Sequence, residues 1–96
     1  MAFRNILLIR LKPGIPVEAI DAFERELAAV PFPGRHNFTF GRDLGLREDN
    51  MDLAVSSDFE DEETFAAWIA DPGHDRVRTQ FLRPIQERVE RCFFRI

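Results

Sequence analysis

FRNILLIRL, residues 3 to 11, is the stretch that decides the fold. The run is rich in Ile and Leu, is short for a helix and is closed by Lys12-Pro13-Gly14, so it predicts a β-strand. Side chains alternate between the two faces of a strand. The odd-numbered positions form an apolar face interrupted by Asn5, while Ile6 and Leu8 make the centre of the opposite face apolar as well. A strand of this kind needs a cover on both sides.

The apolar spacing after this strand predicts a helix and two further strands. Between residues 17 and 30 the apolar residues recur at steps of three and four, the period of a helix with one buried face. Pro31 and Pro33-Gly34 end this helix. Alternation over residues 36–42 and 51–59 then predicts two half-buried strands joined by a polar stretch.

The second half of the chain predicts two more helices and a last strand. A helix follows the acidic run 60–63, whose carboxylates favour the positive end of a helix dipole. Its buried stripe is predicted to be Phe65, Trp68 and Ile69. Asp71-Pro72 is typical of a helix start, with Asp as the N-cap and Pro at the first helical position. This third helix runs to about Leu82, and residues 89–96 form a strand. The inward stripe of the third helix is predicted to be His74, Val77 and Phe81.

The order strand, helix, strand, strand, helices, strand is that of a ferredoxin-like α+β domain, βαββαβ, with a four-stranded antiparallel sheet. Right-handed crossovers place all helices on one face of this sheet. The other face, centred on Ile6 and Leu8, then has no cover within the chain. An exposed apolar sheet face marks an interface, and a two-fold homodimer is the commonest way to bury it. We therefore expect a single domain over residues 1–96 that works as a homodimer, with Ile6 and Leu8 in the interface.

Composition argues against several classes of partner. Thirteen Lys and Arg against 17 Asp and Glu give a net charge of −4, which would repel a phosphate backbone. The arginines alternate with acids instead of forming the polybasic run that binds a membrane surface. We expect neither nucleic acid nor membrane as a partner. The single cysteine, Cys92, and a start without a signal-peptide pattern favour a cytoplasmic protein.

The sequence predicts neither a metal nor a cofactor. His36 and His74 are far apart in the chain, and neither has a cysteine or a carboxylate at ligand spacing. No Gly-rich phosphate loop is present.

Several segments, taken in order, resemble those of the stress-responsive dimeric α/β-barrel family, also called the Dabb domain. They are Ile6 to Gly14, Gly41 to Leu44, Ser57 to Glu63, and Asp71 to His74 followed by Phe81 to Pro84. The resemblance covers nearly the whole chain. It implies a ferredoxin-like fold and a homodimer whose two sheets face each other to make a barrel.

The resemblance also implies a candidate catalytic residue. A plant polyketide cyclase of this family uses the histidine of its Pro-x-His segment as a general base, and His74 matches that histidine. The chain departs from the cyclase at three other polar positions, which are occupied here by Asn5, Leu53 and Trp68.

His74 is also the strongest candidate from the residues alone. It begins the stripe that contains Val77, so its ring should point between the helices and the sheet. The dipole at a helix start disfavours the cationic imidazole, which leaves a neutral base able to accept a proton. The alternative is a histidine that only bonds to Asp71 or to a backbone carbonyl. The residues predicted to line a ligand pocket are Asn5, Phe23, Leu53, Trp68, His74 and Val77, although the same set would suit an ordinary core.

Three functions remain open from the sequence. The favoured one is a homodimeric small domain that binds a small hydrophobic molecule between sheet and helices. The second is a cofactor-free enzyme, a cyclase, isomerase or monooxygenase of small aromatic or polyketide-like compounds, with His74 as general base. The third is a purely structural dimeric stress protein with a solid core.

Overall fold

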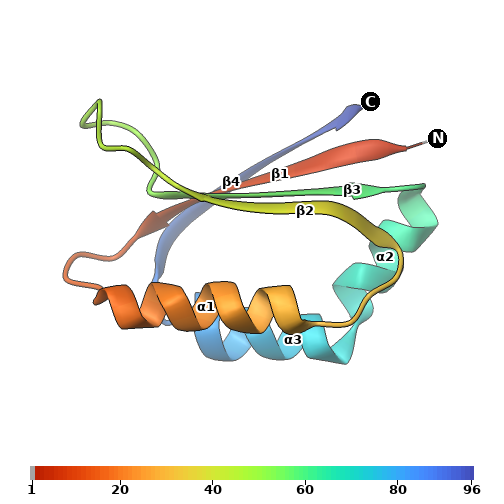
Figure 1. Cartoon of the computed structure of the whole chain (residues 1–96), viewed down its shortest axis with the longest axis horizontal. Helices are drawn as coiled ribbons and strands as arrows, with labels where there is room; N and C mark the ends of the chain where they lie inside the picture. Colours follow the sequence, from red (N-terminus) through yellow and green to blue (C-terminus); the bar gives the residue numbers. More distant parts are fainter. Residues whose placement is uncertain (1) are drawn as a thin grey trace.

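The computed structural model describes residues 2–96, and its elements follow the predicted βαββαβ order (Figure 1). The strands are β1 (Phe3–Leu11), β2 (Arg35–Arg42), β3 (Leu53–Phe59) and β4 (Gln86–Arg95). The helices are α1 (Val17–Ala29), α2 (Glu62–Ala70), α3 (Pro72–Val77) and the π-helix η1 (Arg78–Leu82). The predicted strand starts at 51 and 89 were wrong, because β3 begins at Leu53 and β4 at Gln86.

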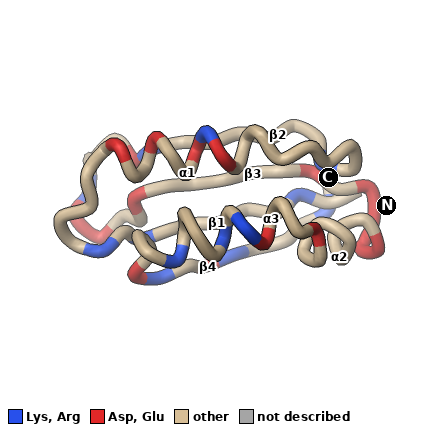
Figure 2. Tube along the Cα trace, turned by 90° about the horizontal axis from the view of Figure 1, so that it is seen from below, with Lys and Arg blue, Asp and Glu red and all other residues tan. Residues whose placement is uncertain are grey.

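The four strands form one antiparallel sheet in the order β2-β3-β1-β4. β1 therefore lies inside the sheet and pairs with β3 on one side and with β4 on the other. All helices lie on one face (Figure 1), and the view from the helix side shows α1 and α3 next to each other across it (Figure 2). The predicted ferredoxin-like arrangement is confirmed.

The core fills the space between the helices and the sheet face that they cover. Ile9, Phe23, Phe59 and Val77 are completely or almost completely buried. They come from β1, α1, β3 and α3, so the apolar stripes of strand and helix meet as their periods predict. No helix in residues 2–96 is long and apolar enough to cross a membrane.

The π-helix changes which side chains face inward near the end of the helical segment. The backbone N–H of Arg83 donates to the carbonyl of Arg78 at 2.9 Å, a bond across five residues that widens the turn. Leu82 is therefore buried, whereas Phe81, predicted to point inward, is only partly buried. Ile69 was also predicted to be buried, but it lies in the last turn of α2 and is 40% exposed.

A buried carboxylate ties three strands together on the face opposite the helices, which we call the outer face. Arg4 and Asp58 stand opposite each other in the β1–β3 register, and Arg4 donates from Nε and Nη2 to the two Asp58 oxygens at 2.8 and 3.0 Å. Asn37 of β2 donates to Asp58 Oδ2 at 2.8 Å. Asn37 lies at a register shift of β2 with φ 51°, a left-handed conformation that Asn tolerates. The hydrogen bonds from Arg4 and then Asn37 lower the pKa of Asp58.

Candidate functional site

A cavity of about 100 Å³ lies between the sheet and the helices, where the sequence predicts a pocket. Five predicted residues border it, and we call it the His74 cavity. These five are Asn5, Phe23, Trp68, His74 and Val77. Most other lining side chains are apolar, and the polar ones are Ser57, Arg78 and Arg91. The fold thus brings these residues together, and their role in binding stays a prediction.

Leu53 is the predicted pocket residue that the structure places elsewhere. It is buried in the core beside its register partner Ile9 and does not border the His74 cavity. Val55, on the same face of β3, borders the cavity instead. Because a strand advances about 3.3 Å per residue, Leu53 lies roughly 7 Å further along β3. The predicted face of the strand was right, and the position along it was wrong by one same-face step.

The geometry of His74 fixes which ring nitrogen carries the proton. Asp71 caps α3, as predicted, by accepting a hydrogen bond from the His74 backbone N–H at 3.0 Å. The imidazole stacks on the Trp68 ring with centroids 3.9 Å apart and planes 14° apart. Its Nδ1 lies 2.9 Å from the Trp68 carbonyl oxygen. Because a carbonyl can only accept, Nδ1 donates, and the neutral ring then has its lone pair on Nε2.

Burial keeps the His74 ring uncharged. Loss of solvent on burial lowers the pKa of His74 to about 4, and the positive charges of Arg78 and Arg35 act in the same direction. The hydrogen bond to the Trp68 carbonyl and the charge of Asp71 oppose this shift. The sequence predicted a neutral ring from the helix dipole, but the helix is six residues long and burial is the larger cause.

Arg78 is a cavity residue that the sequence reasoning missed. It begins η1, and its Nη2 donates to the carbonyl of Ile69 at 2.9 Å and lies 3.3 Å from a carboxylate oxygen of Asp75. Its position four residues after His74 was the available signal, since side chains four apart share a helix face. The sequence pattern was not used to predict a positive charge on the helix face that carries His74.

Two side-chain atoms of the cavity residues are buried without a hydrogen bond among the residues that the structure describes. They are the Oδ1 of Asn5 and the Nε of Arg78. Asn5 lies on the helix-covered face of β1, as predicted, opposite Ser57 of β3. Both residues border the cavity, and the Oδ1 of Asn5 and the Nε of Arg78 are buried beside it without a partner.

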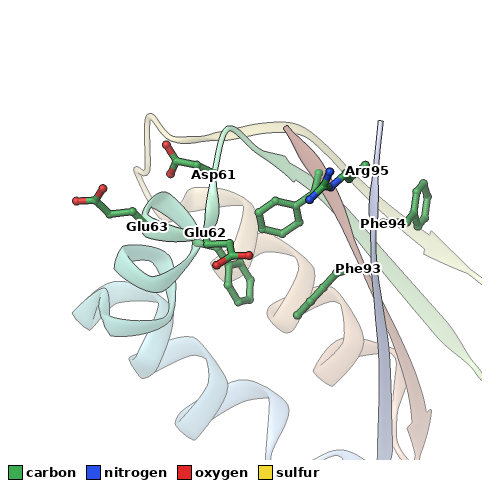
Figure 3. A pocket seen from close by; sticks show the side chains of 8 residues that line it. Asp61, Glu62, Glu63, Phe93, Phe94 and Arg95 are labelled. Atoms are coloured by element: carbon green, nitrogen blue, oxygen red, sulfur yellow. The ribbon is translucent and has the colours of Figure 1, made fainter. Parts of the chain in front are cut away.

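A larger and more open hollow, of about 870 Å³, lies near the two chain ends, and we call it the terminal hollow. Its wall is aromatic, and its rim is acidic at the start of α2. Figure 3 shows Phe93 and Phe94 on opposite sides of β4 and Glu63 pointing away from them. Asp61 is used as the N-cap of α2, where it accepts from the backbone N–H of Thr64 at 2.7 Å. Within residues 2–96 this hollow has no buried polar atom that lacks a partner, so the His74 cavity is the better candidate site.

The outer face carries Ile6 and Leu8, as predicted. Leu8 is 37% exposed and borders an open groove of about 390 Å³ with Leu44 of the β2–β3 connection. Figure 1 shows that this connection rises on the side of the sheet away from the helices. Leu44 and Leu46 within it are about four-fifths exposed. Apolar side chains are therefore exposed on the outer face.

A four-stranded antiparallel sheet with all helices on one face is a ferredoxin-like fold. The family model described as "Stress responsive A/B Barrel Domain" matches residues 3–92. The chain belongs to this family, as the resemblance of its motifs predicted.

Solved structures share the fold over the whole chain. A dimeric ferredoxin-like protein of unknown function from Thermobifida fusca is 27% identical with a TM-score of 0.88, and the match covers 100% of this chain and 92% of that one. A dimeric protein of unknown function from Bacteroides fragilis is 17% identical, with a TM-score of 0.85 and coverage of 99% and 96%. The hydroxynitrile lyase from Passiflora edulis is 22% identical, with a TM-score of 0.86 and coverage of 99% and 93%. A comparison with curated proteins gives no match.

We expect the free energy of unfolding to fall as the pH is lowered from about 6.5 to about 4. In the unfolded chain His74 regains the ordinary histidine pKa of 6.5, so the unfolded state binds a proton that the folded state, with a pKa of about 4, does not. This difference corresponds to a loss of about 3 kcal/mol at most. Urea unfolding across this pH range measures it, and His74→Gln should flatten the slope.

His36→Gln serves as the matched control because it replaces the exposed histidine. That variant should keep the wild-type slope, since His74 is still present. An NMR titration of the folded protein that gives His74 a pKa of 6.5 or higher would contradict the burial argument.

Proposed function

We propose that the chain forms a homodimer through its outer face and binds a small molecule in the His74 cavity. The binding proposal rests on the orphan Oδ1 of Asn5 and Nε of Arg78, which find no partner among the described residues. Leaving a buried polar group unsatisfied costs about 1–3 kcal/mol, and most such groups in folded proteins are paired. A ligand that bonds to both atoms removes this cost.

The size and the wall of the His74 cavity limit what it can hold. Pockets for drug-sized ligands have volumes of about 300–1,000 Å³. The volume here is about 100 Å³, so the ligand has only a few non-hydrogen atoms. Phe23, Val77 and their apolar neighbours suit a small hydrocarbon part. This extends the prediction of a hydrophobic ligand, because the orphan atoms also require polar groups on it.

The dimer is supported by the apolar character of the outer face and by the dimeric relative from Thermobifida fusca. Leu8 and Leu44 border the same groove, so a partner sheet laid on this face would bury both. A two-fold interface uses the same patch on both subunits, which suits a face that is apolar at its centre. Ile6 lies beside Leu8 at this centre, and its register partner in β4 is Cys92.

Leu8→Asp should convert the dimer to a monomer. Two-fold symmetry would place two buried carboxylates in one interface, where charge burial without a partner is costly. Size-exclusion chromatography with light scattering at micromolar concentration measures the mass, and Ile6→Asp should act in the same way. Val17→Asp is the matched control, because Val17 is an exposed apolar residue of α1 on the other side of the molecule. A dimer that survives Leu8→Asp, or a wild-type monomer, would rule out this interface.

Asn5→Leu should stabilise the protein and weaken ligand binding. Leu has nearly the shape of Asn and removes the orphan acceptor, so we expect a gain of about 1 kcal/mol in the free energy of unfolding. A fragment screen by thermal shift and NMR, run on wild type and variant, measures both effects. A stability loss, or unchanged binding, counts against a functional Asn5. If the wild type binds no fragment and its cavity is closed in a crystal structure, the purely structural dimer is the remaining function.

A second candidate function is proton transfer without a cofactor. It is favoured by the tautomer of His74, whose Nδ1 donates to the Trp68 carbonyl and whose Nε2 can accept a proton. A pKa of about 4 makes this imidazole a weak base. The proton removed should therefore be one whose loss Arg78 assists, by stabilising the negative charge that develops on the substrate.

Proton abstraction can be tested before any product is known. Compounds found to bind are incubated in D₂O with the protein, and NMR follows deuterium exchange at the carbon next to a carbonyl group. His74→Gln should slow this exchange by about 100-fold or more. If no bound compound exchanges faster than in buffer, proton transfer is excluded for these ligands while the binding proposal stands.

A further inference from the structure

The charges around the His74 cavity have one sign. Arg78 and Arg91 are the charged side chains among its lining residues, and no Asp or Glu borders it within the described chain. Arg91 stands opposite Leu7 in the β1–β4 register and makes no ion pair among residues 2–96. Figure 2 shows basic and acidic residues on both the α3 segment and β4, but only basic ones border the cavity. A cavity with this lining favours an anion.

The bonding of Arg78 leaves its inner donor free. Nη2 is used by the carbonyl of Ile69 and lies near Asp75, whose side chain is 65% exposed, so this contact is on the solvent side. Nε is buried and has no acceptor among the described residues. A guanidinium N–H pairs best with a carboxylate or phosphate oxygen. A phosphate is bulkier and more highly charged than a carboxylate. The cavity volume of about 100 Å³ therefore favours the smaller carboxylate.

Asn5 requires a different group on the ligand. Its buried Oδ1 needs a hydrogen-bond donor, which a carboxylate cannot supply. A hydroxyl group both donates and accepts, so it satisfies the Asn5 amide in either orientation of its oxygen and nitrogen.

We propose that the ligand of the His74 cavity is a small carboxylate that carries a hydroxyl group, with the carboxylate at Arg78 and the hydroxyl at Asn5. This inference rests on the binding function proposed above and specifies its ligand class. A water molecule takes up about 30 Å³ in the liquid, so a cavity of about 100 Å³ has room for a hydroxy acid the size of glycolate or lactate. Arg91, which is exposed, would attract the anion to the opening.

Four compounds of nearly equal size separate the parts of this proposal. Lactate has both groups, propionate lacks the hydroxyl, lactamide lacks the charge, and 1,2-propanediol lacks the carboxylate. Titration of the wild-type protein, followed by calorimetry and by ¹H–¹⁵N NMR, gives the four dissociation constants. Lactate should bind at least tenfold more tightly than any of the other three, and it should shift the Nε–H signal of Arg78 and the side-chain amide signal of Asn5.

Variants test which residues hold the two groups. Arg78→Gln should weaken lactate at least tenfold and leave 1,2-propanediol unchanged. Arg83→Gln is the matched control, since Arg83 is exposed and lies outside the cavity lining. Asn5→Leu should bring the affinity for lactate down to that for propionate.

Several results would overturn the ligand class without touching the site. If lactamide binds as tightly as lactate, the ligand does not need a negative charge. If propionate binds as tightly as lactate, the ligand does not need a hydroxyl group. An effect of lactate that acetate or chloride reproduces at equal concentration would show a general ionic effect and refute the proposal. Failure of lactate alone refutes the ligand class, whereas failure of every compound in a broad fragment screen refutes the binding function itself.

Discussion

The structure depends on one constraint: the helices of the chain cover only one face of its four-stranded sheet. β1 pairs with both of its neighbours, so its side chains must satisfy two different environments. Asn5 faces the helices and Ile6 faces outward, although they are adjacent in the chain. A slip of one residue would exchange them and put the orphan amide on the outer face. The bidentate bond between Arg4 and Asp58, which stand opposite each other, opposes such a slip.

The charged groups on the two faces of the sheet differ in how many hydrogen-bond partners they have. On the outer face the carboxylate of Asp58 accepts two hydrogen bonds from Arg4 and one from Asn37. On the helix side, burial removes the charge of His74, and Arg78 keeps one donor unused. Because the charge of Arg78 lowers the pKa of His74, an anion bound at Arg78 would raise it again. Under the proposed binding, occupancy of the cavity and the pKa of its histidine would therefore be coupled.

Much of this arrangement follows from short-range patterns. The period of two in residues 3–11 identifies both faces of β1, and Asp71-Pro72 identifies the start of α3, so the faces that carry Asn5 and His74 could be predicted. Position along an element was harder to predict. Val55 rather than Leu53 reaches the cavity, because that depends on the register between strands, which residues far apart in the chain determine.

The π-helix and the orphan atoms could not be predicted from local sequence. Arg78 to Leu82 have ordinary helical residue types, and the wider turn that buries Leu82 instead of Phe81 exists only in the packed structure. An unpaired atom is likewise a property of the surroundings, and the Asn5 residue type gives no sign of it. The sequence therefore predicts which residues border the cavity better than which of their polar atoms lack a hydrogen-bond partner.

The partner of the His74 ring nitrogen has a lasting consequence for how this site can change. The acceptor is the backbone carbonyl of Trp68, which also receives the N–H of Asp71 at the end of α2. Every amino acid at position 68 would supply the same carbonyl. Point substitutions there can alter the stacking surface but leave the proton on Nδ1, so the orientation of the base is inherited with the path of the chain between two helices. Only an insertion or deletion in that short connection would be expected to reverse it.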